Sequence, residues 1–293
     1  MASDRMKPII PGVLVPGVSL LCLLLTACAG MVGARLGNTI ASGIQSQDEP
    51  QTVAAAMPAY LVMSDGLIAE NPKDAQLLLA GARLYSTYAA LFVTDEQRTR
   101  RMAAKGFAYA RRAICLSYAE LCTKTAQSYA RFSVIIRSID RQDALPLLYA
   151  YATAWAVRIQ ASSGAWGSLA DVPRVELLLQ QVISLDDRYD HGQPHVYLGI
   201  INSRLPAALG GHPEIGRKHF ERAVALSHGR NLAARLAYAR YYARLLFDRP
   251  LHDKLLRAVL SADPHEPGLT LSNVMAQQQA RNLLKQSAEY FEE

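Results

Sequence analysis

Histidines, carboxylates and cysteines are the residues of this 293-residue chain that could do chemistry, and their spacing decides whether they do. His191 and His195 have the four-residue spacing of zinc ligands on a helix. However, Gly192 and Pro194 lie between them, which indicates a loop leading into a helix and not one helical face. We therefore expect no metal site, and nothing else in the sequence predicts a cofactor.

Carboxylates form a second group. Asp186, Asp187 and Asp190 cluster in SLDDRYDHG, and two carboxylates can act as general acid and general base in a glycosidase. Their place at a helix end and in a loop is typical of capping and turn residues. Because no G-x-S-x-G, H-E-x-x-H or Walker motif is present, we expect a protein without catalytic activity. A helical hydrolase that uses these acids is the alternative.

A glycine-rich stretch, LPAALGGHPEIGRKHFERA, raises the question of a phosphate-binding loop. Such a loop normally follows a strand, whereas a helical run ending at Pro206 comes before this one. Gly210-Gly211 can supply a turn with positive φ, and Pro213 suits the first turn of the next helix. We predict a turn between two helices, with Gly216, Phe220 and Ala223 facing the neighbouring helix.

The N-terminus carries the most specific signal. Arg5 and Lys7 precede IIPGVLVPGVSLLCLLL, an apolar segment too short and too proline-broken to span a membrane stably. It ends in LTAC, which resembles the lipobox of bacterial lipoproteins. The resemblance implies a signal peptide over residues 1–27, acylation of Cys28 and, because Ala29 follows, the periplasmic side of the outer membrane. An ordinary signal peptide followed by a chance cysteine is the alternative.

Cys115 and Cys122 remain in the mature chain, in an oxidising compartment that permits a disulfide. In an unbroken helix, residues seven apart are separated by about 10 Å along the axis, which is beyond the reach of a disulfide. A bond therefore requires the chain to turn within LSYAEL. The sequence leaves a disulfide and two free thiols open.

Helices are the elements that must position all these residues. After a small, polar tether over residues 28–50, apolar residues recur at three- and four-residue spacing from Gln51 almost to the end, and no segment alternates as a strand would. Hydrophobic residues make up 51% of the chain, as in a globular protein, and the net charge of +6 is scattered, which does not favour nucleic-acid binding. We predict one all-α domain over residues 51–293, with its later helices near 123–139, 142–161, 172–185, 194–205, 213–227, 230–246, 250–261 and 267–291.

Degenerate repeats are visible within this helical pattern. Ala103-x3-Phe107-x2-Ala110 and Gly216-x3-Phe220-x2-Ala223 match the second helix of a tetratricopeptide repeat, and Tyr197-Leu198-Gly199 resembles its first helix. The spacings drift and no unit is complete. Because a single hairpin cannot bury its own apolar face, we expect the hairpins to stack into a curved α-solenoid.

Aromatic residues suggest where a ligand could bind. The chain has 14 tyrosines against 6 phenylalanines and 2 tryptophans. Tyrosine in a helix often places its ring in an apolar wall and its hydroxyl at water, which suits a groove for an amphipathic ligand, although packing at the core edge explains any single one. Trp166, in the loop SSGAWGS, is either a plug that seals the core or a ligand or partner contact.

Two long segments, GRKHFERAVALSHGRN at 216–231 and ADPHEPGLTLSNVMAQQQARNLL at 262–284, carry a family resemblance together with shorter ones at 48–72, 164–169 and 184–192. The chain resembles the T component associated with tripartite ATP-independent periplasmic (TRAP) transporters. The most specific matches are His219-Phe220-x2-Ala223 and Asn273-x2-Ala276-Gln277-x2-Ala280. ALGGHPEI and the interrupting Pro206 depart from the family pattern.

This resemblance implies a periplasmic lipoprotein of degenerate tetratricopeptide repeats that can assemble as a trimer. It also implies docking of the transporter's solute-binding protein and handling of hydrophobic or organic-acid ligands. Trp166, Tyr197, Asn273 and Gln277 are the candidate ligand or partner contacts. An outer-membrane assembly scaffold that binds peptide segments on the same concave surface is the alternative within binding proteins.

Overall fold

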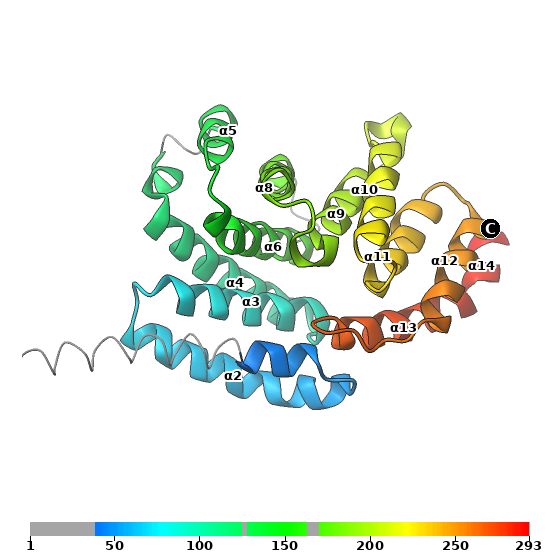
Figure 1. Ribbon diagram of the computed structural model, residues 1–293, viewed down its shortest axis with the longest axis horizontal. Helices are drawn as coiled ribbons and strands as arrows, with labels where there is room; N and C mark the ends of the chain where they lie inside the picture. Colours follow the sequence, from blue (N-terminus) through cyan, green and yellow to red (C-terminus); the bar gives the residue numbers. More distant parts are fainter. Residues whose placement is uncertain (1–38, 125–127, 163–169, 293) are drawn as a thin grey trace, which may run out of the picture.

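The computed structural model describes residues 39–124, 128–162 and 170–292 (Figure 1). All the regular elements in this part of the chain are helices, so the predicted all-α class is confirmed. Residues 39–45 are helical, and the main helices that follow are α2 (Pro50–Glu70), α3 (Ala75–Leu91), α4 (Glu96–Ser117), α5 (Tyr129–Arg137), α6 (Leu145–Ala161), α8 (Val172–Leu185), α9 (Tyr189–Asn202), α10 (Pro213–Leu226), α11 (Leu232–Ala237), α12 (Arg249–Ser261), α13 (Thr270–Lys285) and α14 (Ser287–Glu292). Short elements of other types are η1 (Ala119–Cys122), η3 (Gln142–Ala144), η4 (Ala207–Leu209) and the π-helix η5 (Tyr238–Ala243).

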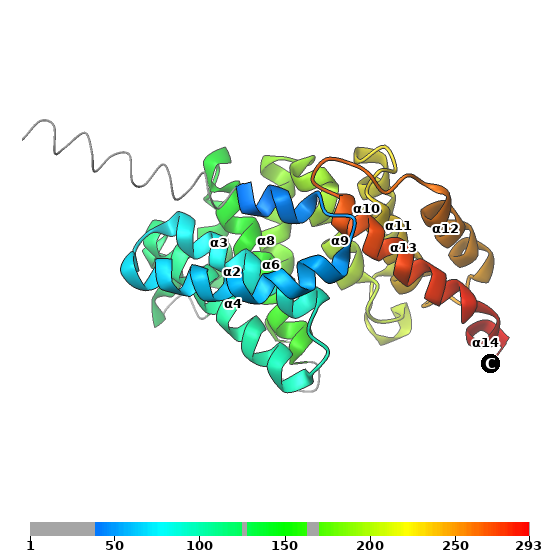
Figure 2. The same cartoon turned by 90° about the horizontal axis from the view of Figure 1, so that it is seen from below.

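Helices that follow one another along the chain pack against one another, as expected of a solenoid. α3 packs between α2 and α4, α6 packs on α4 and α8, and α9 packs on α8 and α10. The array curves, so that α13 lies beside the first helices in both views and contacts α2 (Figures 1 and 2). The N-terminal and C-terminal hairpins are therefore in contact across the inside of the curve.

Proline and aspartate residues mark several of the helix boundaries. α2 ends at Glu70, just before Asn71-Pro72, and α12 has Pro250 as its second residue. The Asp74 carboxylate accepts hydrogen bonds from the backbone N–H groups of Gln76 and Leu77, and Asp248 accepts one from Leu251. Each side chain satisfies N–H groups that a helix start leaves unpaired.

Three predicted helices differ from the structure. The stretch expected over 123–139 contains α5, which begins only at Tyr129. The one expected over 267–291 begins at Thr270, because Gly268 adopts a φ of 77° that does not continue into a helix, and it breaks at Gln286. The one expected over 230–246 changes into the π-helix η5, in which the Arg244 N–H donates to the Ala239 carbonyl five residues back.

Small residues bring α9 and α10 close together, as the repeat motif predicts. A Cβ atom added to Gly199 would lie 2.6 Å from the Phe220 ring, and one added to Gly216 would lie 2.1 Å from Ser203 Oγ. Gly216, Phe220 and Ala223 are all buried, so their predicted orientation toward the neighbouring helix is confirmed. The glycine-rich stretch is a turn: Gly210 has a φ of 83°, and Pro213 is the first residue of α10.

The chain turns sharply between the two cysteines. α4 ends at Ser117, Tyr118 leaves the helical conformation with a φ of −133°, and η1 reverses the direction. This turn brings the Cα atoms of Cys115 and Cys122 to 5.8 Å, and a disulfide joins the two residues. Such a short cross-link holds η1 against the end of α4.

Helix α2 is the one helix in the described ranges that is long and apolar enough to cross a membrane, with a mean hydropathy of 1.4. Length and composition alone do not separate a membrane span from a core helix. Here Val53, Met57, Leu61 and Ile68 are buried, and α2 packs on α3 as a member of the helical array.

Candidate functional site

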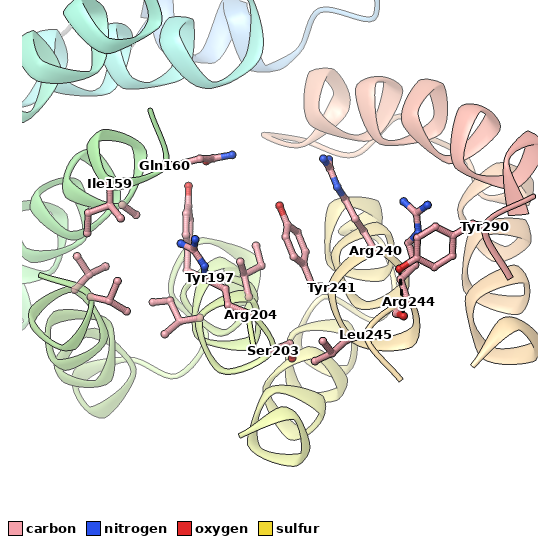
Figure 3. A pocket seen from close by; sticks show the side chains of 15 residues that line it. Ile159, Gln160, Tyr197, Ser203, Arg204, Arg240, Tyr241, Arg244, Leu245 and Tyr290 are labelled. Atoms are coloured by element: carbon pink, nitrogen blue, oxygen red, sulfur yellow. Dashed lines mark hydrogen bonds between the residues drawn. The ribbon is translucent and has the colours of Figure 1, made fainter. Parts of the chain in front are cut away.

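A central cavity of about 540 Å³ opens between the middle and the C-terminal helices (Figure 3). Its walls come from α6, α8, α9, the π-helix η5 and the C-terminal Tyr290. The lining residues are Ala156, Ile159, Gln160, Val172, Val175, Tyr197, Ile200, Ile201, Ser203, Arg204, Arg240, Tyr241, Arg244, Leu245 and Tyr290. Its size is within the range of small-molecule sites in proteins.

Positive charge without a counter-charge is the main electrostatic feature of the central cavity. Arg204, Arg240 and Arg244 line it, and no aspartate or glutamate does. Among the described residues, none of the three arginines has a carboxylate within ion-pair distance. The Arg240 guanidinium instead donates to the neutral amide of Gln279 at 3.4 Å, and the Arg244 guanidinium lies 3.6 Å from the centre of the Tyr290 ring. This arrangement attracts an anion.

Two buried polar atoms of this lining have no hydrogen-bond partner in the described part of the chain: Ser203 Oγ and Arg244 Nε. Ser203 is only 2% exposed. A buried polar group that is left unsatisfied costs about 1–3 kcal/mol. Both atoms are closed off from solvent, and Ser203 Oγ lies beside Gly216 in the α9–α10 crossing, so neither is open to a ligand in the cavity.

Tyrosine hydroxyls and one side-chain amide are further polar groups of the central cavity. Figure 3 shows the hydroxyls of Tyr197 and Tyr241, the Gln160 amide and the Arg240 guanidinium pointing toward the same side of the cavity. Burial, reinforced by the charge of Asp190, raises the pKa of Tyr197 to about 12. Its hydroxyl therefore keeps its proton at physiological pH and can donate a hydrogen bond to an anion.

A second cavity of about 370 Å³ adjoins the first. It lies between the helical residues 39–45, α2, α3, α9 and the start of α13, and Tyr197 lines both cavities. Most of its wall is aliphatic or methionine, as in Ile44, Met63 and Leu84. The two cavities thus differ in chemistry: the central one is basic and the second one is mainly apolar.

The four predicted contact residues have different places in the structure. Tyr197 lines both cavities, whereas Cys28 and Trp166 lie outside the described residues. Asn273 is fully buried; its oxygen accepts from the Leu232 N–H at 2.9 Å, and its nitrogen donates to the carbonyls of Arg230 and Pro264. Gln277 donates to the carbonyls of Val259 and Ala262. The amides of Asn273 and Gln277 therefore hold backbone segments together and line neither cavity.

The stretch from His191 to His195 is a break followed by a helix and not one helical face, as its glycine and proline predict. Asp190, His191 and Gly192 all have positive φ values, so His191 is not on the helical face that carries His195. His195 instead contacts His219 on α10, with 2.8 Å between their Nδ1 atoms, and its Nε2 lies 2.8 Å from Asp187. Burial and the neighbouring His195 lower the pKa of His219 to about 4, so this imidazole is neutral. The described residues contain no group of three or more metal-ligating side chains.

The three clustered carboxylates do not converge on a common cavity. Asp187 binds Arg222 and His195, and Asp186 accepts a hydrogen bond from the backbone N–H of Arg188. Of the three, only Asp190 lines one of the two cavities, the second one, where its charge adds to burial in raising the pKa of Tyr149. A hydrolase that draws its acid and base from this group thus lacks the required pair.

The cavity arginines are the functional candidates that sequence reasoning missed. Arg240, Tyr241 and Arg244 stand close together in the sequence, and that spacing is their only sequence signal. These residues lie in or next to the π-helix η5, whose hydrogen bonds span five residues instead of four and therefore change the angular spacing of the side chains along the helix. Such π-turns occur frequently at functional sites.

Degenerate helical hairpins arranged around a basic, acid-free cavity define a helical-repeat protein. A sequence model of the family described as TRAP transporter T-component matches residues 46–291, so the chain belongs to this family. This is a family of transporter components and not a family of enzymes, and it points to a membrane-associated, periplasmic place of action. No curated protein was found to match the chain.

Proposed function

We propose that this protein is a lipid-anchored, periplasmic T component of a TRAP transporter that binds a small organic anion in its central cavity. It is held at the outer membrane by acylated Cys28 and docks the transporter's solute-binding protein. Membership of the T-component family supports the role in transport, and the LTAC sequence supports the anchor.

The three cavity arginines, which have no carboxylate partner among the described residues, carry the proposal for the ligand. A carboxylate in the central cavity would receive charge-assisted hydrogen bonds, which are the strongest kind available to a neutral-pH site. The aliphatic side chains of Ile159, Val175 and Ile200 would contact the hydrocarbon part of the ligand.

Arg240→Gln is expected to weaken the binding of small organic acids ten- to hundredfold. A hydrogen bond to a charged group contributes about 1.5–3 kcal/mol, which corresponds to that range of Kd. Isothermal titration calorimetry with butanoate and succinate measures the effect. The matched control is Arg101→Gln, which removes the same charge from an exposed position of α4 outside both cavities. Equal affinities for the two variants would contradict the proposed site.

Cys28→Ser is expected to move the protein from the membrane fraction to the soluble periplasmic fraction. The substitution removes the sulfur that would carry the acyl chains, and anchoring depends on the buried hydrocarbon. Fractionation followed by immunoblotting measures the change, and unchanged membrane association would rule out the anchor. In wild-type membranes, a reversible crosslinker should join the protein to a TRAP solute-binding protein.

A further inference from the structure

The central cavity and the second cavity lie along one face of α9. Gln193 lines the second cavity, Tyr197 lines both, and Ile200 and Ile201 line the central cavity. These residues follow the three- and four-residue spacing of one helical face, and Gln193 is about 12 Å from Ile201 along the axis. α9 is thus a common wall, and Tyr197 stands at the boundary between the two cavities.

The two cavities offer opposite kinds of contact along this wall. The central cavity is lined by Arg204, Arg240 and Arg244 and by no aspartate or glutamate. In the second cavity the polar groups are mostly engaged within the protein: Asp74 caps α3, and Ser64 and Ser272 donate to backbone carbonyls.

Three charged residues line the second cavity: Asp74, Asp190 and Arg83. Asp74 caps α3, the charge of Asp190 adds to burial in raising the pKa of Tyr149, and Arg83 is exposed. The remaining wall is mainly apolar and includes Met57, Leu77 and Leu271. The second cavity therefore presents a mainly apolar wall, and none of its described lining residues has a buried polar atom without a hydrogen-bond partner.

We propose that the two cavities bind one elongated amphipathic anion, a carboxylate with a linear hydrocarbon chain of about eight or more carbons. The carboxylate lies among Arg204, Arg240 and Arg244, and the chain passes Tyr197 into the second cavity. The inference rests on the proposed binding of an organic anion and adds the class and the orientation of the ligand.

Tyr197 is suited to the point where the head group and the chain meet. Its hydroxyl points to the side of the central cavity where the Arg240 guanidinium also lies (Figure 3). Its ring has apolar faces, and the ring of Tyr149, another residue of the second cavity, meets it edge-on with 6.4 Å between centroids. An aromatic wall of this kind accepts a hydrocarbon chain, and the hydroxyl can donate to the carboxylate.

Titration calorimetry with butanoate, octanoate and dodecanoate, each below its critical micelle concentration, tests the inference. The Cys28→Ser protein keeps the entire folded body and avoids detergent. We expect dodecanoate to bind at least tenfold more tightly than butanoate, because each added methylene buries apolar surface in the second cavity. Dodecanol, which has the same chain and no charge, is expected to bind at least tenfold more weakly than dodecanoate.

Two variants separate the chain from the head group. Ala233→Phe places a ring in the second cavity and should reduce dodecanoate affinity to the level of butanoate, while butanoate affinity stays unchanged. Arg240→Gln should weaken both acids. Ala104→Phe, at an exposed position of α4 that lines neither cavity, is the matched control and should change neither.

The outcomes distinguish this inference from the proposed function. If butanoate and dodecanoate bind equally and Arg240→Gln weakens both, the anion site stands and the two-cavity ligand is excluded. If dodecanol binds as tightly as dodecanoate, the assignment of the head group is wrong. If none of the acids binds, the proposed anion site itself fails.

Discussion

Gly199→Leu is expected to lower the free energy of unfolding by about 3 kcal/mol, at the upper end of the usual cost of overpacking a core. A Cβ atom at this position would lie 2.6, 2.7 and 2.8 Å from three atoms of the Phe220 ring. The ring has nowhere to move, because it is fully buried and stacks on Tyr238 with 5.4 Å between centroids. Equilibrium denaturation in urea, followed by circular dichroism, measures the loss.

The matched control for this prediction is Gly66→Ala in α2, where an added Cβ meets nothing within 4 Å. Alanine is a better helix former than glycine, so this variant should gain about 0.5–1 kcal/mol. The second test is rescue: Phe220→Leu should recover part of the stability that Gly199→Leu loses. If Gly199→Leu is as stable as wild type, α9 and α10 do not cross as closely as described.

Asn273→Leu is expected to cost about 4 kcal/mol of unfolding free energy. The amide makes three hydrogen bonds, to the N–H of Leu232 and to the carbonyls of Arg230 and Pro264. Leucine is close in size to asparagine, but it leaves the buried Leu232 N–H and two part-buried carbonyls without this partner, and a fully buried unsatisfied group costs about 1–3 kcal/mol before relaxation. The measurement is again denaturation in urea.

Asn282→Leu on the same helix is the control for this second prediction, because Asn282 is exposed. It should change stability by less than about 0.5 kcal/mol, as is usual for surface positions. Asn273→Asp gives a finer test: it keeps the acceptor for Leu232 but loses the donor to both carbonyls. If Asn273→Leu unfolds at the same urea concentration as the wild type, these hydrogen bonds make no net contribution to the free energy of unfolding.

Local sequence signals were sufficient to predict the all-α fold. Apolar periodicity and the proline boundaries identify the helices, because each depends only on residues a few positions apart. The small residue at Gly216 and the aromatic at Phe220 predicted a close crossing, and the structure buries both against α9. Predicted helices differed where one positive φ, as at Gly268, or one extra residue, as in η5, changes the backbone.

Most residues of the candidate site could not be predicted from the sequence, because they come together only in the folded chain. Arg204 follows α9, Arg240 and Arg244 belong to the π-helical region, and Tyr290 comes from α14. Tyr197 was found because it belongs to a repeat motif. Asn273 and Gln277 stand in the most specific part of the family pattern, yet their amides bind backbone carbonyls. A strong motif can thus mark the residues that hold a fold together instead of those that contact a ligand.

The contact between α13 and α2 limits how this architecture can change. In an open solenoid each repeat touches only its neighbours, so a repeat can be inserted or deleted without disturbing distant ones. Here an inserted hairpin would carry Leu271 and Ser272 away from α2, and the second cavity would lose one of its walls. The number of hairpins is therefore set by the geometry of closure, and gain or loss of a repeat is expected to be rarer in this chain than in open repeat proteins.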